Sequence, residues 1–450
     1  MTKQNPSPEK NASAFAAATA AMLRSARGMV GLVGWIRPTE PLELQIVGRT
    51  LLHAAAVGLG AGILGCLFFA GAGLTQDLLL ETLAGYEPLR AAGERVWEHV
   101  EVPSLRLWLL VLIPALGALV GGALMRFAPE CRGGGGDATI DAFHHDNGVV
   151  RRRVLWVKPL ASIATLGSGG SGGREGPTMH LGAALGSVVG RYLKVSERER
   201  RVLMVAGIAA GISAVFRTPL GAALLAIEML YRDDFEAEAL IPAVLASVIA
   251  YSVAITVFGE STMFGHLTPY AFRPQHIPLF IGLALVMSLA ASLFVAAIRA
   301  TQRITAKLPI AEWVRPAIGG LALGIIVVLI IHFLAPFLGR GDRGVGILGG
   351  GYGLAQIAIT GADWLSTGWQ AVEVLVLLGV AKILATSLTI GTGGSAGDFA
   401  PALAIGATLG GAFGLAARLI LNDPTIQPGA FALVGMGAFY GGIANTPLAH

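Results

Sequence analysis

The chain has 450 residues, of which 54% are hydrophobic and only 13% are charged, and its mean hydropathy is +0.68. Because a soluble domain carries about 25% charged residues, this composition excludes an ordinary soluble protein and indicates a polytopic membrane protein. The formal net charge of +4 and the pI near 9.2 are attributed to membrane topology, so they predict no nucleic-acid partner.

The first part of the chain begins polar, and residues 1–45 are expected to form a retained cytoplasmic or interfacial segment. A helix needs about 20 apolar residues to cross the hydrocarbon of a bilayer. Uncharged runs of that length predict membrane-spanning helices over 50–76, 107–125, 239–259, 274–298 and 316–339. Shorter runs, cut by glycines or charges, predict broken or re-entrant helices over 159–173, 176–190, 202–216, 383–397 and 399–417.

Basic residues indicate the orientation of the chain in the membrane. Lysines and arginines gather before the first span and in the loop after the second, so both regions should face the cytoplasm. Residues 77–101 are rich in acids, which is consistent with the outer side. We therefore expect a multi-pass protein of the inner cell membrane with a cytoplasmic N-terminus. Cys66 in a span and Cys131 in a cytoplasmic loop predict no structural disulfide.

An internal repeat organises the chain. The stretch GSGGSGGREGPTMHLGAALGSVVGR from Gly167 aligns without a gap with GTGGSAGDFAPALAIGATLGGAFGL from Gly391, and similar segments flank both. The repeat predicts a first transmembrane unit over 46–260 and a second over 274–450. The first unit continues past its TPL motif, whereas the second stops soon after Thr446-Pro447-Leu448 and is expected to lack its last helices.

Glycine-rich loops occupy matching positions in the two units, which in transporters indicates a binding site near the membrane midplane. Each loop precedes a helix with a proline in its first turn, Pro177 or Pro401. A helix N-terminus presents unpaired amides and about half a positive charge, so two of them with a third loop, GGGGD at 133–137, favour a small anion. The spaced glycines Gly182, Gly186 and Gly190 are predicted to serve close helix packing.

These motifs resemble the CLC family of chloride channels and proton/chloride antiporters, from about Ile46 to the end of the chain. GREGP at 173–177 matches one family signature, and GDFAP at 397–401 matches another except at Asp398. The resemblance implies an all-α polytopic membrane protein of two inverted-topology repeats with many tilted, broken helices. It also implies a homodimer with one pore per subunit, surrounded by lipid, with chloride as its transported ligand and no cofactor, metal or catalytic residue.

The resemblance assigns roles to particular residues. Glu175 corresponds to the family's gate, a carboxylate that competes with the anion and moves away when protonated. An intramembrane glutamate is functional by default, although simple pairing of Glu175 with Arg174 is the alternative. The anion would be bound largely by backbone amides, at Gly133, Gly134, Arg174, Gly176, Asp398, Phe399 and Ala400.

Two positions depart from the family pattern at the anion site. Gly134 stands where the family usually has a serine whose hydroxyl contacts the anion, so selectivity is expected to be looser and the substrate is a small monovalent anion. Asp398 replaces an apolar residue, and it is either a second titratable group or the N-cap of the following helix.

A third departure concerns the proton route. Glu228 matches a glutamate shared across the family, and Met229 occupies the internal proton-relay position of the antiporters. Methionine cannot carry a proton, which favours a glutamate-gated passive channel, with proton/chloride antiport through other acids such as Asp233 or Asp234 as the alternative. Tyr440 precedes the last TPL motif and is not the family's anion-capping tyrosine.

A membrane oxidoreductase remains a remote alternative, and a second pattern imitates a metal site. GSGGSG at 167–172 satisfies the GxGxxG pattern of a membrane oxidoreductase, but the confirming strand and acidic residue are missing. A cluster in a polar loop imitates a metal site but is typical of a solvated turn: Asp141, His144, His145 and Asp146.

Overall fold

The computed structural model describes residues 42–94, 103–231, 236–260, 262–265, 270, 273–333, 344–362, 365 and 367–444. Nearly all of the N-terminal segment predicted over 1–45 lies outside these ranges, as do Asp233, Asp234 and the last TPL motif at 446–448. Within them the regular elements are helices. This confirms the all-α fold expected from the sequence.

The helices follow one another in two series. The first contains α2 (Leu42–Gln76), the π-helix η2 (Asp77–Leu83), α3 (Leu107–Leu124), η3 (Pro129–Cys131), α4 (Gly136–His144), α5 (Val154–Gly167), α6 (Glu175–Tyr192), α7 (Glu197–Phe216), α8 (Pro219–Glu228), η4 (Ala237–Ala239) and α9 (Leu240–Phe258). The second contains η5 (Pro274–His276), α10 (Ile277–Ala306), α11 (Arg315–Phe333), α12 (Tyr352–Thr360), α13 (Trp369–Ile390), α14 (Phe399–Leu421) and α15 (Pro428–Ala444).

The two series match from α4–α7 to α12–α15. Helices α4 and α12 each have nine residues and each begins after a glycine with a φ of 88°, Gly135 or Gly351, a conformation that L side chains rarely adopt. The helices that follow the signature loops, α6 and α14, then pack against α7 and α15. The repeat read from the sequence is therefore longer than the aligned motifs, because it includes the short helices α4 and α12.

Seven helices among the described residues are long and apolar enough to cross a membrane, in agreement with a polytopic chain. They include α13 and α14, for which short, interrupted segments were expected. That expectation is wrong for both helices. α14 is uninterrupted from Phe399 to Leu421, and the predicted segment 383–397 began only after the charge of Lys382. The Lys382 ammonium is buried and hydrogen-bonded to main-chain carbonyls, so the helix continues through it from Trp369 to Ile390.

Glycines bring the helix pairs close together. A Cβ atom at Gly182 of α6 would collide with the carbonyl of Gly207 of α7, and one at Gly207 would collide with that of Gly182. The same reciprocal contact joins Gly406 of α14 to Gly435 of α15. The predicted packing role of the glycines on α6 is thus confirmed, and the second half uses the same contact.

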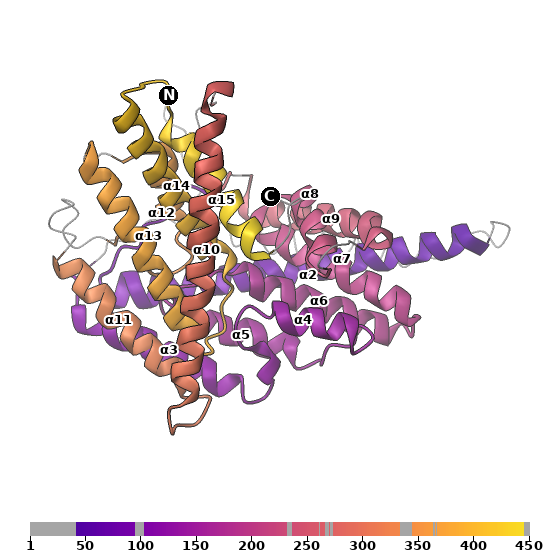
Figure 1. Ribbon diagram of the computed structural model, residues 1–450. Coiled ribbons are helices and arrows are strands. Elements are labelled where there is room, and N and C mark those ends of the chain that lie inside the picture. The colour runs from indigo at the N-terminus through magenta and orange to yellow at the C-terminus, as the bar shows by residue number, and fades with distance from the viewer. Residues whose placement is uncertain are drawn as a thin grey trace, which may run out of the picture.

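The two halves also meet away from the signature loops. In Figure 1, α4–α9 lie together on one side and α11–α15 on the other. Although α3 belongs to the first series, it lies beside α11 of the second. Leu110 and Ile113 of α3 share an apolar cluster with Leu323 and Val327 of α11. Cys66 and Cys131 are both buried free cysteines, in agreement with the prediction that they form no structural disulfide.

Candidate anion site

Three glycine loops converge between the two halves. A Cβ atom at Gly176 would lie 3.0 Å from the Cα atoms of both Gly134 and Gly397. Gly134 lies in the loop before α4, Gly176 in the first turn of α6, and Gly397 in the loop before α14. Side chains are excluded at Gly176 by this packing, so the point where the loops meet is built from main chain.

Hydrogen bonds join the two signature loops directly. The amide of Gly173 donates to the carbonyl of Gly397 at 2.7 Å, and the amide of Gly397 donates back to Gly173 at 2.8 Å. Hydroxyl groups extend this seam: Ser162 pairs with Ser395 at 2.8 Å, and the amide of Ser171 donates to Thr389 at 3.0 Å. The N-termini of α6 and α14 are therefore held in a fixed relation to each other.

Two fully buried lysines fix the loops before α4 and α12. Lys158 of α5 donates to the carbonyls of Cys131 at 3.0 Å and Gly133 at 2.6 Å. Lys382 of α13 donates to Ile347 at 2.9 Å and Gly349 at 2.6 Å. Each ammonium uses two of its three donors in this way. The two lysines occupy matching positions before the aligned loops that begin at Gly167 and Gly391. Sequence reasoning did not indicate their partners, which lie in loops far from them along the chain.

Glu175 is the first residue of α6 and only 3% exposed. One carboxylate oxygen, Oε1, accepts a hydrogen bond from the hydroxyl of Tyr352 and lies 3.9 Å from Nε of Arg174. Among the described residues the other oxygen, Oε2, has no hydrogen-bond partner. A Cβ atom at Gly173 would meet both Oε2 and the amide nitrogen of Ala400, so Oε2 lies near the beginning of α14. The carboxylate thus occupies the space between two helix N-termini.

Arg174 does not form a close ion pair with Glu175. Its guanidinium stacks on Phe69, 4.2 Å from the ring centroid, and lies 5.5 Å from the centroid of the Tyr352 ring. The separation of 3.9 Å from Oε1 is longer than a hydrogen bond. Simple pairing of Glu175 with Arg174 is therefore a poor description, and Tyr352 is the direct partner that sequence reasoning missed.

The other residues singled out in the second signature lie at the same place. Asp398 holds the N-cap position of α14, yet its side chain forms no capping hydrogen bond, so the capping interpretation is wrong. The ring of Phe399 packs against Phe216 and Tyr440, with centroids 4.7 Å and 4.4 Å away. In the first glycine loop the amide of Gly133 already donates to Gly394 at 3.1 Å.

Met229 lies away from these loops, at the C-terminal end of α8. Its side chain packs against an apolar cluster that includes Leu225 and Leu230. Of the residues that imitate a metal site, His145 lies 2.9 Å from Asp141 on an exposed helix face, and His144 contacts the carbonyl of Leu230 at 2.7 Å.

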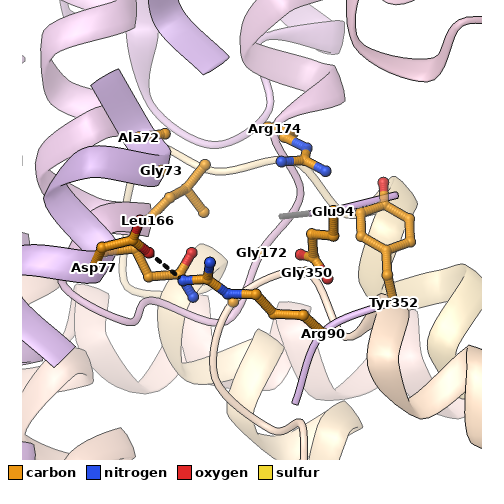
Figure 2. Close-up of a pocket in the computed structure, with 12 residues that line it drawn as sticks. Ala72, Gly73, Asp77, Arg90, Glu94, Leu166, Gly172, Arg174, Gly350 and Tyr352 are labelled. Carbon is orange, nitrogen blue, oxygen red and sulfur yellow. Dashed lines mark hydrogen bonds and ion pairs between the residues drawn. The ribbon is translucent and has the colours of Figure 1, made fainter. Parts of the chain in front are cut away.

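A small cavity lies beside the first signature loop, at Gly172 and Arg174. It has a volume of about 40 Å³, and Tyr352 and Arg174 lie in its wall, whereas Glu175 does not. Figure 2 shows Glu94 between Arg174 and Arg90, and Arg90 bonded to Asp77. Asp77 begins the segment expected on the outer side from its acids.

The helical fold and the paired helix N-termini between two repeats define a polytopic membrane protein built like a secondary transporter. A family model described as voltage gated chloride channel matches residues 116–450. The H⁺/Cl⁻ exchange transporter ClcA of Vibrio campbellii is 30% identical over 404 residues, which are 88% of this chain and 79% of that protein. ClcA of Yersinia pseudotuberculosis is 31% identical over 406 residues, 88% of this chain and 78% of that protein. The chain belongs to the CLC family of voltage gated chloride channels and their exchange-transporter relatives.

Solved structures share the fold. A slow cyanobacterial Cl⁻/H⁺ antiporter superimposes with a TM-score of 0.71 at 23% identity, covering 87% of this chain and 85% of its own. A CLC-type fluoride/proton antiporter superimposes with a TM-score of 0.68 at 20% identity, covering 91% of each chain. The resemblance stated from GREGP and GDFAP is confirmed, and so is the CLC-type fold.

Proposed function

We propose that the protein exchanges protons for chloride or a similar small monovalent anion, with Glu175 as its gate. The observation that carries this proposal is the family match to relatives that are named H⁺/Cl⁻ exchange transporters. The presence of Met229 at the relay position favoured a passive channel in the sequence analysis. Proton/anion exchange now replaces the passive channel as the main interpretation. The passive channel remains the second candidate, because the usual relay position still holds a side chain without a titratable group.

The place of Glu175 supports its role as the gate. Its carboxylate lies between the N-termini of α6 and α14, which is also where an anion would be most favoured. A tethered carboxylate and a free anion then compete for one place. Protonation removes the charge of Glu175, so the anion enters when a proton binds. We propose the amides of Gly134, Arg174, Gly176, Asp398, Phe399 and Ala400 as its ligands, without a cofactor or metal.

Asp398 is the proposed substitute for the missing internal relay. It follows Gly397 of the seam on the chain, and its carboxylate does not cap α14. Asp137 is among the charged groups that act on it. Asp137 is exposed at the start of α4. We propose that a proton reaches the anion site through these two acids instead of through the position of Met229. We further propose a homodimer in the inner membrane, with a cytoplasmic N-terminus and no enzymatic activity.

Simultaneous flux measurements test exchange against passive conduction. The purified protein is reconstituted in liposomes with a chloride gradient, and chloride and proton movements are recorded together. Proton movement against its own gradient, in fixed proportion to chloride, is the expected result. Chloride flux without proton movement would establish the channel instead, and the absence of any anion flux would reject both.

A further inference from the structure

Tyr352 is held rigidly at the beginning of α12. Gly351 before it has a φ of 88°, and a Cβ atom there would lie 2.8 Å from Cε of Lys382 and 2.9 Å from Cβ of Ala404. The carbonyl of Gly349 in the same loop accepts a hydrogen bond from Lys382. The phenol ring is therefore positioned by a main chain that has little freedom to move.

The environment of the ring points its hydroxyl at Glu175. Tyr352 is only 1% exposed, and its ring packs edge-on against Phe216 and Phe264, with centroids 6.3 Å and 6.4 Å away. The hydroxyl donates to Oε1 of Glu175, and both groups are buried. Hydrogen bonds to an ionised acceptor are about twice as strong as those between neutral groups. The phenol consequently stabilises the charged, path-blocking form of the carboxylate.

The contact joins the two halves of the molecule, and the repeat provides no second copy of it. By the match of α4 with α12, Gly136 is the counterpart of Tyr352, and it has no side chain to reach across. The cavity of about 40 Å³ is lined by Tyr352 and Arg174 but not by Glu175, so Tyr352 contacts both the cavity and, through its hydroxyl, the carboxylate. This placement suits a residue that controls how readily the carboxylate leaves.

Other charged or titratable groups also act on the carboxylate. Arg174 precedes it on the chain, and Glu94 acts from the loop after η2. Tyr440 of α15 interacts electrostatically with both Glu175 and Asp398. Tyr352 is distinguished among the described residues because its side chain hydrogen-bonds to the carboxylate.

We propose that Tyr352 is a positioning residue that latches the deprotonated Glu175 in the anion path and so sets the pH at which anions begin to move. The proposal rests on the proposed role of Glu175 as the gate. Protonation of Glu175 weakens the latch, because a neutral carboxyl is a poorer acceptor than a carboxylate. Loss of the hydroxyl should therefore allow anion movement at a higher pH.

The test is the Tyr352→Phe variant, which keeps the ring and removes only the hydroxyl. Chloride flux into liposomes is measured from about pH 4.5 to about pH 8.5, a range that begins near the ordinary glutamate pKa of about 4.3 and covers neutral pH. The pH of half-maximal flux should rise by about one unit, and flux at the alkaline end should rise about tenfold, as expected for loss of a hydrogen bond to a charged group.

A matched control removes a hydroxyl that hydrogen-bonds to the other end of the same helix. The hydroxyl of Tyr270 donates to the carbonyl of Ile359 at 3.0 Å, near the C-terminus of α12. Tyr270→Phe should leave the pH profile unchanged. A profile shifted equally by both variants would show a general loosening of α12 and overturn the latch.

The Glu175→Ala background separates the latch from the gate. If the gate is correct, Glu175→Ala conducts without pH dependence, and adding Tyr352→Phe changes nothing further. A Tyr352→Phe profile identical to wild type, with Glu175→Ala independent of pH, would reject the latch and leave the gate intact. Wild-type pH dependence in Glu175→Ala would reject both, and an effect of Tyr352→Phe that persists without Glu175 would also reject the latch.

Discussion

Replacing Gly134 by serine should add a side-chain ligand to the anion site. The Cβ atom of residue 134 would lie 3.4 Å from Cα of Gly397 and 4.0 Å from Cα of Gly176, which are ordinary contacts. The neighbouring glycines have φ values of 61° at Gly133 and 88° at Gly135, so only the middle position accepts a side chain without backbone strain. The serine hydroxyl would then lie among the converging loops.

The expected gain follows from one added hydrogen bond to an ion. Such a bond contributes about 1.5–3 kcal/mol, and each 1.4 kcal/mol is about a tenfold change in affinity. We therefore expect chloride to bind Gly134→Ser about tenfold more tightly, the lower end of this range, because the hydroxyl also loses solvation. Isothermal titration calorimetry in detergent measures this best in a Glu175→Ala background, where the tethered carboxylate no longer competes.

Two controls define what would refute the reasoning. Gly134→Ala adds the same Cβ atom without a hydroxyl and should leave the affinity unchanged. Gly176→Ser would place its Cβ atom 3.0 Å from two main-chain Cα atoms and should reduce the yield of monodisperse protein. Equal chloride affinities for Gly134→Ser and Gly134→Ala would show that this loop does not face the anion.

Further predictions concern the gate, the relay, the glycine contacts and the buried lysines. Glu175→Gln should abolish the pH dependence of chloride flux, measured in liposomes. An unchanged pH dependence would reject Glu175 as the gate and indicate Asp398 as the titrating group. Asp398→Asn should lower proton flux relative to chloride flux, and an unaltered ratio would exclude it as a relay. Gly182→Val should lower the melting temperature because its side chain meets the Gly207 carbonyl, whereas Gly442→Ala, with open space around it, should not. Lys382→Met leaves two carbonyls without their donor and should cost about 2–6 kcal/mol, seen as a lower melting temperature.

The sequence was informative where function depends on main chain. Glycines in GSGGSGGREGP and GTGGSAGDFAP, with a proline beginning each helix, are a local pattern, so the loops and their repeat could be read directly. The helix N-termini and the position of Glu175 at the beginning of α6 then followed. Packing through Gly182 was also predictable, because glycines four residues apart share one helix face.

Long-range partners were not predictable in the same way. Lys382 interrupted an apolar run and suggested a break, because hydropathy does not record that carbonyls of a distant loop satisfy its charge. Tyr352 lies 177 residues from Glu175 along the chain, and nothing local connects them. One signal was present: GGGY at 349–352 parallels GGGG at 133–136 before a helix of equal length, which would have drawn attention to the tyrosine.

The reciprocal hydrogen bonds between Gly173 and Gly397 limit how this molecule can work. Many transporters expose a central site alternately by rocking one repeat against the other as rigid bodies. Here the repeats are stitched together at the site itself, and a large rotation would break both amide bonds and the hydroxyl pair of Ser162 and Ser395. A moving part on the scale of one side chain would leave the seam closed, and the proposed gate Glu175 is of that size. With such a gate, access to the site would change by displacement of a carboxylate while the protein around it keeps its shape.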